Sequence, residues 1–466
     1  MRFRIPRFWL LLPVAALLLC GPALYNGYPL VYADTGTYLS SGMRWQAPED
    51  RPLMYGGWIR VLSLHGATLW PVIWAQGLIM AWLLLRFLRG ALDAQLAERW
   101  ALPLTGLLAL ATGAGWYTSQ LMPDWLLPAG VLAWLCLRLD PDWRRAAAPA
   151  LVLALAAGAH LSHGLILAGI LLADWLAAAW AARRWAPARA HGIGFSALAI
   201  GLAAALSLNA AAGGGWRLAR WGHVVLLGRM LDAGMLKPFL DERCPEAGYA
   251  LCGYRDALPG SSREFIWDPE RSPALRAGGW QAVRQDYLHV LGDALRSPRY
   301  LLWMAGEALR STASQLLQNP LGEGLETDWY GSPGSPPWEA IRRYVPHEHP
   351  VFLNARQQTD IWNQRLNLGW LQTLHSLLLA ASAGWLCYQL GAGRLRQLPP
   401  ARRRILAGLL AALLANAAVT ATLANVYGRL QGRVSWLLIL AALLTAAWMY
   451  AEPGKNRPDL SRTPPE

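Results

Sequence analysis

Apolar residues in this chain occur in blocks of about twenty, separated by short polar or basic stretches. The blocks lie at residues 8–26, 67–85, 101–116, 125–138, 147–162, 164–182, 193–212, 366–390, 405–424 and 431–450. A helix of about twenty apolar residues matches the thickness of a bilayer core. The pattern predicts an all-α polytopic membrane protein with about ten transmembrane helices.

The composition favours the same class of protein. Of 466 residues, 55% are apolar and 15% are charged, whereas soluble domains carry about 25% charged residues. A disordered chain would be less apolar, and five cysteines are too few for a disulfide scaffold. The net charge of +13 is expected where arginines anchor cytoplasmic loops, so no nucleic-acid partner is predicted.

Arginines predict the orientation in the membrane. Basic residues gather in alternate connections, at residues 2–7, 86–99, 138–145, 183–189, 394–404 and 455–462. The short connections between them, 117–124 and 160–163, contain no lysine or arginine. Short basic loops stay in the cytoplasm, so both termini are expected inside. We expect the first block to remain as an uncleaved anchor, because further spans follow it.

This topology divides the chain into four parts. Residues 1–212 form an N-terminal transmembrane module with a first outer loop at 27–66, and residues 213–365 form a periplasmic domain between spans 7 and 8. Residues 366–450 are the C-terminal transmembrane helices, and 451–466 are a cytoplasmic tail. Within the periplasmic domain, an apolar stripe along 298–318 predicts a surface helix against the bilayer.

Two cysteines fall in the predicted periplasmic domain. Cys244 and Cys252 are separated by seven residues, and an oxidising compartment would let them pair. The alternative is two unpaired thiols.

The first outer loop contains an acid soon after the first span. Asp34 would lie at the boundary of water and lipid, where partial desolvation raises a carboxyl pKa and improves it as a proton acceptor. The alternative is that Asp34 caps a helix beginning at Thr35. Tyr38 follows four residues later, and Arg51 opens an amphipathic stretch expected to lie flat on the membrane. Tyr38 and Arg51 are candidate substrate-binding residues.

Two further outer connections carry candidate residues. Asp124 follows Pro123, where it either joins the site or simply offsets a helix dipole. His160 and His163 are three apart, which places them on one helical face. They either contact a phosphate or are interfacial polar residues without a function. Two ligands without a third do not make a metal site.

The last outer connection contains Arg429, Gln431 and Arg433 at the start of a span. Arginines four apart share a helical face and suit phosphate oxygens; the alternative is snorkelling to the membrane boundary. Asp174 lies in the middle of an apolar block, where it is a functional candidate or is paired with an arginine at the inner rim.

The first span, the outer Asp34, two surface helices and a second span together resemble the start of GT-C superfamily glycosyltransferases. Tyr38 resembles an aromatic residue often found after the acid of that family, and Tyr427-Gly-Arg429 resembles a carrier-phosphate motif. The resemblance implies transfer of a sugar from a polyprenyl-phosphate to a glycan, lipid or protein acceptor at the periplasmic face of the bacterial inner membrane. Asp34 would be the catalytic base. Many members carry two adjacent acids where this chain has Asp34-Thr35, so no cofactor is required and a divalent metal is an open alternative.

Two other classes of function stay open. O-antigen polymerases or ligases also combine about ten spans with a long outer loop and outer arginines, but they do not rely on a first-loop acid. A transporter or a non-enzymatic membrane protein is the other alternative. The scarcity of charges within the spans argues against ion-coupled transport.

Overall fold

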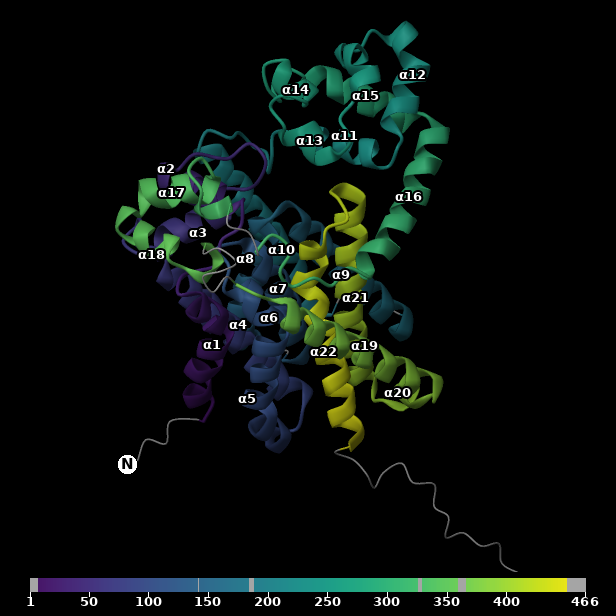
Figure 1. Ribbon diagram of the computed structural model, residues 1–466. Helices are drawn as coiled ribbons and strands as arrows, with labels where there is room; N and C mark the ends of the chain where they lie inside the picture. Colours follow the sequence, from purple (N-terminus) through teal and green to yellow (C-terminus); the bar gives the residue numbers. More distant parts are fainter. Residues whose placement is uncertain (1–6, 141, 184–187, 326–328, 359–365, 451–466) are drawn as a thin grey trace, which may run out of the picture.

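The computed structural model describes residues 7–140, 142–183, 188–325, 329–358 and 366–450. These residues are folded into helices and loops, and their one β-type contact is an isolated bridge between Leu30 and Gln120. A bundle of long helices carries a separate group of shorter helices at one end (Figure 1). We call this end of the bundle the domain end.

The helices of the bundle are α1 (Arg7–Asn26), α4 (Trp70–Ala91), α5 (Ala94–Ala111), α7 (Leu126–Leu139), α8 (Trp143–Ala159), α9 (Leu161–Ala182), α10 (Arg189–Ala211), α19 (Gly369–Gly391), α21 (Pro400–Leu423) and α22 (Gly428–Tyr450). Short helices around its ends are α2 (Thr35–Arg44), α3 (Met54–Leu62), α6 (Gly113–Thr118), α17 (Pro336–Tyr344), α18 (His349–Leu353) and α20 (Arg394–Gln397). Single 3₁₀ turns lie at η1 (Pro123–Trp125), η3 (Trp329–Gly331), η4 (Pro346–Glu348) and η5 (Arg356–Gln358).

Five helices in the described part of the chain are long and apolar enough to cross a membrane: α4, α9, α10, α21 and α22. Within α1, the apolar helical stretch Leu10–Asn26 is shorter. An all-helical, multi-pass membrane protein is therefore supported. The predicted count of about ten spans is not confirmed, although a helix forms at each of the ten apolar blocks.

The clearest departure from the predicted spans is α7. It has 14 residues, which at 1.5 Å per residue is about 21 Å, less than the thickness of a bilayer core. Every side chain from Leu126 to Leu137 is buried. An apolar run of this length is more typical of a buried core helix than of a span, and α7 lies inside the bundle.

The two described ends of the chain lie on the same side of the molecule, and which side of a membrane this is stays a prediction. Figure 1 shows α1 beginning and α22 ending at the end opposite the short-helix group. The predicted cytoplasmic tail, 451–466, and the basic positions at 2–6 and 184–187 lie outside the described residues, as do residues 359–365 at the edge of the predicted periplasmic domain.

The short-helix group has its own core. It comprises α11 (Gly222–Asp232), α12 (Leu236–Ala247), η2 (Ala250–Ala257), α13 (Ser262–Trp267), α14 (Pro273–Arg276) and α15 (Arg284–Arg296). Their buried side chains, among them Phe239, Phe265 and Tyr287, form a cluster distinct from that of the bundle. We call this group the outer domain; it lies within the predicted periplasmic segment 213–365.

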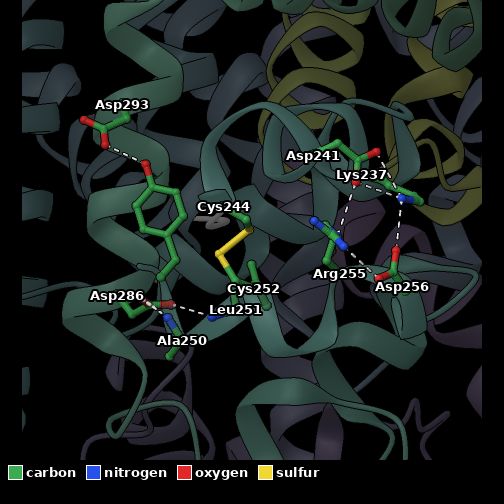
Figure 2. Close-up of a disulfide and its surroundings, with 11 residues drawn as sticks. Lys237, Asp241, Cys244, Ala250, Leu251, Cys252, Arg255, Asp256, Asp286 and Asp293 are labelled. Carbon is green, nitrogen blue, oxygen red and sulfur yellow. Dashed lines mark hydrogen bonds and ion pairs between the residues drawn. A yellow bond between two sulfur atoms is a disulfide. The ribbon is translucent and has the colours of Figure 1, made fainter. Parts of the chain in front are cut away.

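The predicted disulfide is present in the outer domain. Cys244 at the end of α12 is bonded to Cys252 in η2, with 5.5 Å between their Cα atoms (Figure 2). Asp286 accepts hydrogen bonds from the backbone amides of Ala250 (2.7 Å) and Leu251 (3.2 Å), which fixes the η2 turn beside the disulfide.

The predicted surface helix forms but is oriented differently. Helix α16 (Pro298–Leu316) descends from the outer domain beside α21 (Figure 1) instead of lying across the end of the bundle. Its stripe remains uncovered, since Leu302 and Leu309 are 75% and 76% exposed. The opposite face packs on α21, where Ser311 is buried.

Asp174 was predicted either to be functional or to pair with an arginine, and the structure shows an arginine partner. The Asp174 carboxylate lies 3.0 Å from Arg138 Nε and 3.0 Å from His191 Nε2. These contacts join α9, α7 and α10 and offset the burial of an acid in an apolar helix.

Removing the disulfide should destabilise the outer domain. We expect Cys244→Ser to lower the free energy of unfolding by about 2–3 kcal/mol, because the cross-link closes a short loop in the unfolded chain. Thermal unfolding of the purified protein under oxidising conditions measures the change. Cys387→Ser, at an exposed free cysteine, is the matched control; equal losses in both variants would contradict the prediction.

Candidate functional site

The predicted site residues converge at the domain end of the bundle. They come from the α1–α2 loop, from α2 itself, from the α2–α3 loop, from η1, from the start of α9 and from the start of α22. The nine residues are Asp34, Tyr38, Arg51, Asp124, His160, His163, Arg429, Gln431 and Arg433. Their contacts form two adjoining clusters, one partly exposed and one buried.

The partly exposed cluster is centred on Asp34. Its carboxylate accepts a hydrogen bond from Arg51 Nη2 at 3.0 Å and one from Arg429 Nη1 at 3.4 Å. The Asp34 side chain is 29% exposed, while those of Arg51 and Arg429 are 11% and 14% exposed. Asp34 occupies the N-cap position of α2, which begins at Thr35 as the helix-cap alternative predicted, but its side chain makes no capping hydrogen bond.

Aromatic rings support both arginines of this cluster. The Arg51 guanidinium lies over the Tyr38 ring at 4.9 Å, and the Arg429 guanidinium lies over the Tyr32 ring at 4.1 Å. Tyr38 in turn packs edge-on against Tyr55, 5.1 Å away. A cation over an aromatic face is stabilised by the ring quadrupole, so both charges are held in place without blocking their N–H groups.

The electrostatics of Asp34 correct one prediction. Burial raises the carboxyl pKa, as expected, but the charges of Arg51 and Arg429 outweigh it and lower the pKa of Asp34 to about 2. An acid with this pKa is a weak proton acceptor. In this state Asp34 is an anion that orders two cations, because opposite charges within a few ångströms favour the charged form.

The buried cluster is centred on Arg433. Its side chain is 0% exposed and its Nη1 lies 3.1 Å from Asp124, which is 2% exposed. Arg433 also donates to Asn416 (2.9 Å from Nη2) and Ser162 (3.2 Å), and its Nη1 lies 3.3 Å from His163 Nε2. With Nε also directed at Asn416, each of its five N–H groups has an acceptor. The structure therefore gives Arg433 a packing role, where a phosphate-binding role was predicted.

The two histidines are adjacent, as their spacing predicted, with ring centroids 4.9 Å apart. His160 caps α9 by accepting the Ser162 amide proton at Nδ1, 3.3 Å away. Burial and the nearby Arg433 lower the pKa of His160 to about 3, so it is neutral at pH 7. His163 Nδ1 lies 3.2 Å from the Ala156 carbonyl, which leaves Nε2 to accept from Arg433.

Gln431 also serves the buried cluster. Its Oε1 accepts a hydrogen bond from Asn416 Nδ2 at 2.8 Å, and this orients the Asn416 Oδ1 toward Arg433. Gln431 is 2% exposed, so like Arg433 it is a supporting residue.

Two glycines explain how α22 presents its arginines. A Cβ on Gly428 would lie 1.9 Å from Pro320, and one on Gly432 would lie 2.5 Å from the Tyr117 hydroxyl. Any larger side chain at these positions would push α22 away from Pro320, in the segment that follows α16, and from α6. The Arg429 carbonyl accepts a hydrogen bond from Tyr117 at 3.0 Å, which fixes the first turn of α22.

Several residues of the site were not predicted from the sequence. Tyr32, Asp50 and Asn416 each contact one of its arginines. Asp50 could have been predicted, because an acid directly before Arg51 is a natural partner for it. In the structure Asp50 accepts a hydrogen bond from Arg51 Nε at 2.7 Å. Asn416 is one polar residue within an apolar helix, which is costly unless it is hydrogen-bonded.

A metal requirement stays an open prediction. The described residues contain no group of three or more His, Cys, Asp and Glu side chains that could hold an ion. Asp34 and Asp124 both face arginines, so an ion at either carboxylate would have to displace a cation.

Comparison with known proteins identifies no relative. No family model matches the chain, and neither a curated protein nor a solved structure matches it.

Breaking the buried ion pair should destabilise the whole bundle. We expect Asp124→Asn to cost about 3–5 kcal/mol, because Arg433 would remain buried without a counter-charge. Thermal unfolding in detergent micelles measures the loss. Asp241→Asn, in the exposed pair with Lys237, should cost less than about 1 kcal/mol.

The melting temperatures of the two variants test whether the buried pair stabilises the bundle. Similar melting temperatures for Asp124→Asn and Asp241→Asn would show that the buried pair is unimportant. Adding Arg433→Met to Asp124→Asn should recover part of the loss, since no uncompensated charge is then left.

The Asp34 pKa predicts a specific pH dependence. Because its folded pKa lies below the ordinary value of 3.8, Asp34 adds stability that is present above pH 3.8 and is lost as the pH falls to about 2. The wild-type protein should therefore be more stable than Asp34→Asn at neutral pH, and the difference should disappear near pH 2. Paired unfolding curves measure this; a difference that grows on acidification would contradict it.

Proposed function

We propose that this chain is a GT-C-like glycosyltransferase that moves a sugar from a polyprenyl-phosphate donor to an acceptor at the periplasmic face of the bacterial inner membrane. One observation carries the proposal. Asp34, Arg51 and Arg429 meet at the end of an apolar bundle, and Asp34 is the only described hydrogen-bond partner of the Arg429 guanidinium. Cations with unused donors at a membrane boundary suit a lipid-linked phosphate.

The donor phosphate would compete with Asp34 for the arginines. Arg429 keeps N–H groups for phosphate oxygens, and Arg51 is held by Asp50 while it reaches Asp34. Arg433 contributes by fixing α22, one helical turn below Arg429.

This competition restores Asp34 as a base. When a phosphate takes one arginine, the remaining positive charge around Asp34 falls, and burial then raises its pKa toward the range of a useful proton acceptor. In the transfer step the bond from the sugar C1 to the phosphate oxygen breaks and its electron pair leaves with the phosphate. The acceptor hydroxyl oxygen bonds to C1, and its proton passes to Asp34.

Two other features support the assignment. An apolar cavity of about 290 Å³ lies between the outer domain, α16 and the end of α21, and Arg429 lies in the first turn of α22, the helix that follows α21. Such a cavity suits part of a prenyl chain. The disulfide of the outer domain is typical of an oxidising compartment, which supports a periplasmic location for the domain end.

The proposal is tested by transfer in nanodiscs. Asp34→Asn should lower kcat about a hundredfold or more, because a general base contributes at least this much. Arg429→Gln should be similarly impaired, because it removes charge from the departing phosphate. Release of polyprenyl phosphate from labelled polyprenyl-phosphate sugars measures both, and Arg296→Gln, at an 81% exposed arginine, is the control.

The outcomes separate the alternative functions. Full activity of Asp34→Ala at normal protein levels would favour a polymerase or ligase of the O-antigen type. Movement of a solute into proteoliposomes without consumption of any lipid-linked sugar would favour a transporter. In a deletion strain, the lipid-linked saccharide that accumulates identifies the donor.

A further inference from the structure

A second cavity, of about 480 Å³, lies between the first outer loop and the outer domain. Its floor is formed by α2 and the loop that follows it, and one side is formed by the start of α17. The other side is formed by three tryptophans of the outer domain, Trp221, Trp267 and Trp280. Figure 1 shows the first outer loop reaching toward α13 at this place. We call this cavity the tryptophan cleft.

The three indoles form one rigid aromatic unit. Trp221 and Trp280 are stacked with 3.7 Å between ring centroids, and Trp267 packs edge-on against Trp280 at 5.6 Å. Trp280 Nε1 donates to the Ile266 carbonyl at 3.2 Å, which fixes its orientation. Trp221 is buried, but Trp267 is 50% exposed. An ordered and half-exposed tryptophan offers a flat apolar surface at low entropic cost.

The opposite walls of the cleft are polar. Carboxylates come from Glu49, Asp50 and Glu339, and hydroxyls come from Thr37, Ser40 and Ser41. No salt bridge or hydrogen bond to the Glu49 carboxylate occurs among the described residues. Hydrogen-bond acceptors opposite an aromatic surface match a pyranose ring, whose C–H face is apolar and whose edge carries hydroxyl donors.

The charges of the cleft favour an uncharged ligand. Three carboxylates line the cavity, but Asp50 is paired with Arg51 and Glu339 with Arg342. Glu49 and Arg44 are the remaining charges of the lining. The cleft therefore has no excess of positive charge for an anionic ligand, whereas its hydrogen-bond acceptors suit the hydroxyls of a neutral sugar.

The cleft is connected to the candidate site through Asp50. Asp50 lines the cleft and also holds Arg51 through a hydrogen bond of 2.7 Å to Nε, and Arg51 contacts Asp34 at 3.0 Å. A ligand that contacts Asp50 in the cleft is thus linked through Arg51 to Asp34, the residue on which the proposed chemistry depends.

We propose that the tryptophan cleft is the acceptor subsite, and that it binds a neutral saccharide by stacking one sugar ring on Trp267 and directing its hydroxyls to Glu49 and Asp50. The assignment of the cleft as an acceptor subsite rests on the proposed function. The binding of a saccharide in the cleft does not depend on that function.

Binding to the purified full-length protein in nanodiscs tests the inference. The probes are cellobiose, N,N'-diacetylchitobiose and mannobiose, with glucuronate as the acidic counterpart, and saturation-transfer NMR detects weak complexes. At least one disaccharide should bind the wild-type protein, and glucuronate should bind more weakly. Trp267→Ala should weaken binding at least about tenfold, the loss expected for a central tryptophan contact.

Two further variants separate a lost contact from a lost fold. Trp267→Phe keeps an aromatic face and should restore part of the binding. Trp370→Ala, at a 67% exposed tryptophan of α19 outside the cleft, should bind like the wild type. Absence of binding by all three disaccharides, or unchanged binding by Trp267→Ala, would overturn the inference.

The result is separable from the transfer assay. Saccharide binding that depends on Trp267, without any release of polyprenyl phosphate, would leave the cleft in place and remove the proposed reaction. Transfer that proceeds normally in Trp267→Ala would keep the reaction and place the acceptor elsewhere.

Discussion

The buried pair of Arg433 and Asp124 is the interaction on which the site depends. Both side chains are almost inaccessible to solvent, so their charges cost several kcal/mol to desolvate and are tolerated only with complete partners. The partners come from α9, α21 and η1. Satisfying one guanidinium therefore fixes the relative positions of three segments at the domain end, and with them the first turn of α22.

The two arginines at the start of α22 therefore have different contacts. Arg433 uses all its donors within the protein, whereas Arg429, one turn nearer the domain end, uses one of its guanidinium nitrogens on Asp34. Spacing of four residues placed both on one face, as the sequence predicted, but it could not separate their roles. The difference arises from depth, because only the buried arginine meets the polar side chains of neighbouring helices.

The sequence predicted the helical membrane class, the disulfide and the residues that meet at the domain end. Apolar blocks, cysteines in a predicted outer segment and polar residues in outer loops are all local signals. The sequence did not predict properties that depend on contacts between distant segments. The apolar run of α7 becomes a buried helix because other helices enclose it; its short length of 14 residues favoured this outcome, but the sequence does not show which helices would surround it. The lowered pKa of Asp34 depends on Arg51 and on Arg429, and Arg429 is nearly four hundred residues away in the chain. Likewise, the three tryptophans of the cleft come from separate segments, and their sequence positions do not show that their rings stack.

The proposed function requires Asp34 to be unreactive until the donor binds. Without the two arginines, partial burial would raise the pKa of Asp34. A protonated Asp34 would carry no charge, and it could not hold Arg51 and Arg429 in place. Paired with both arginines, the Asp34 carboxylate keeps the two cations at the domain end, where they stack on Tyr38 and Tyr32. In the proposed reaction, an incoming phosphate would replace one ion pair with another, so little charge would have to be newly desolvated when it binds. The same exchange would release the carboxylate, and the basicity of Asp34 would then depend on the presence of the donor.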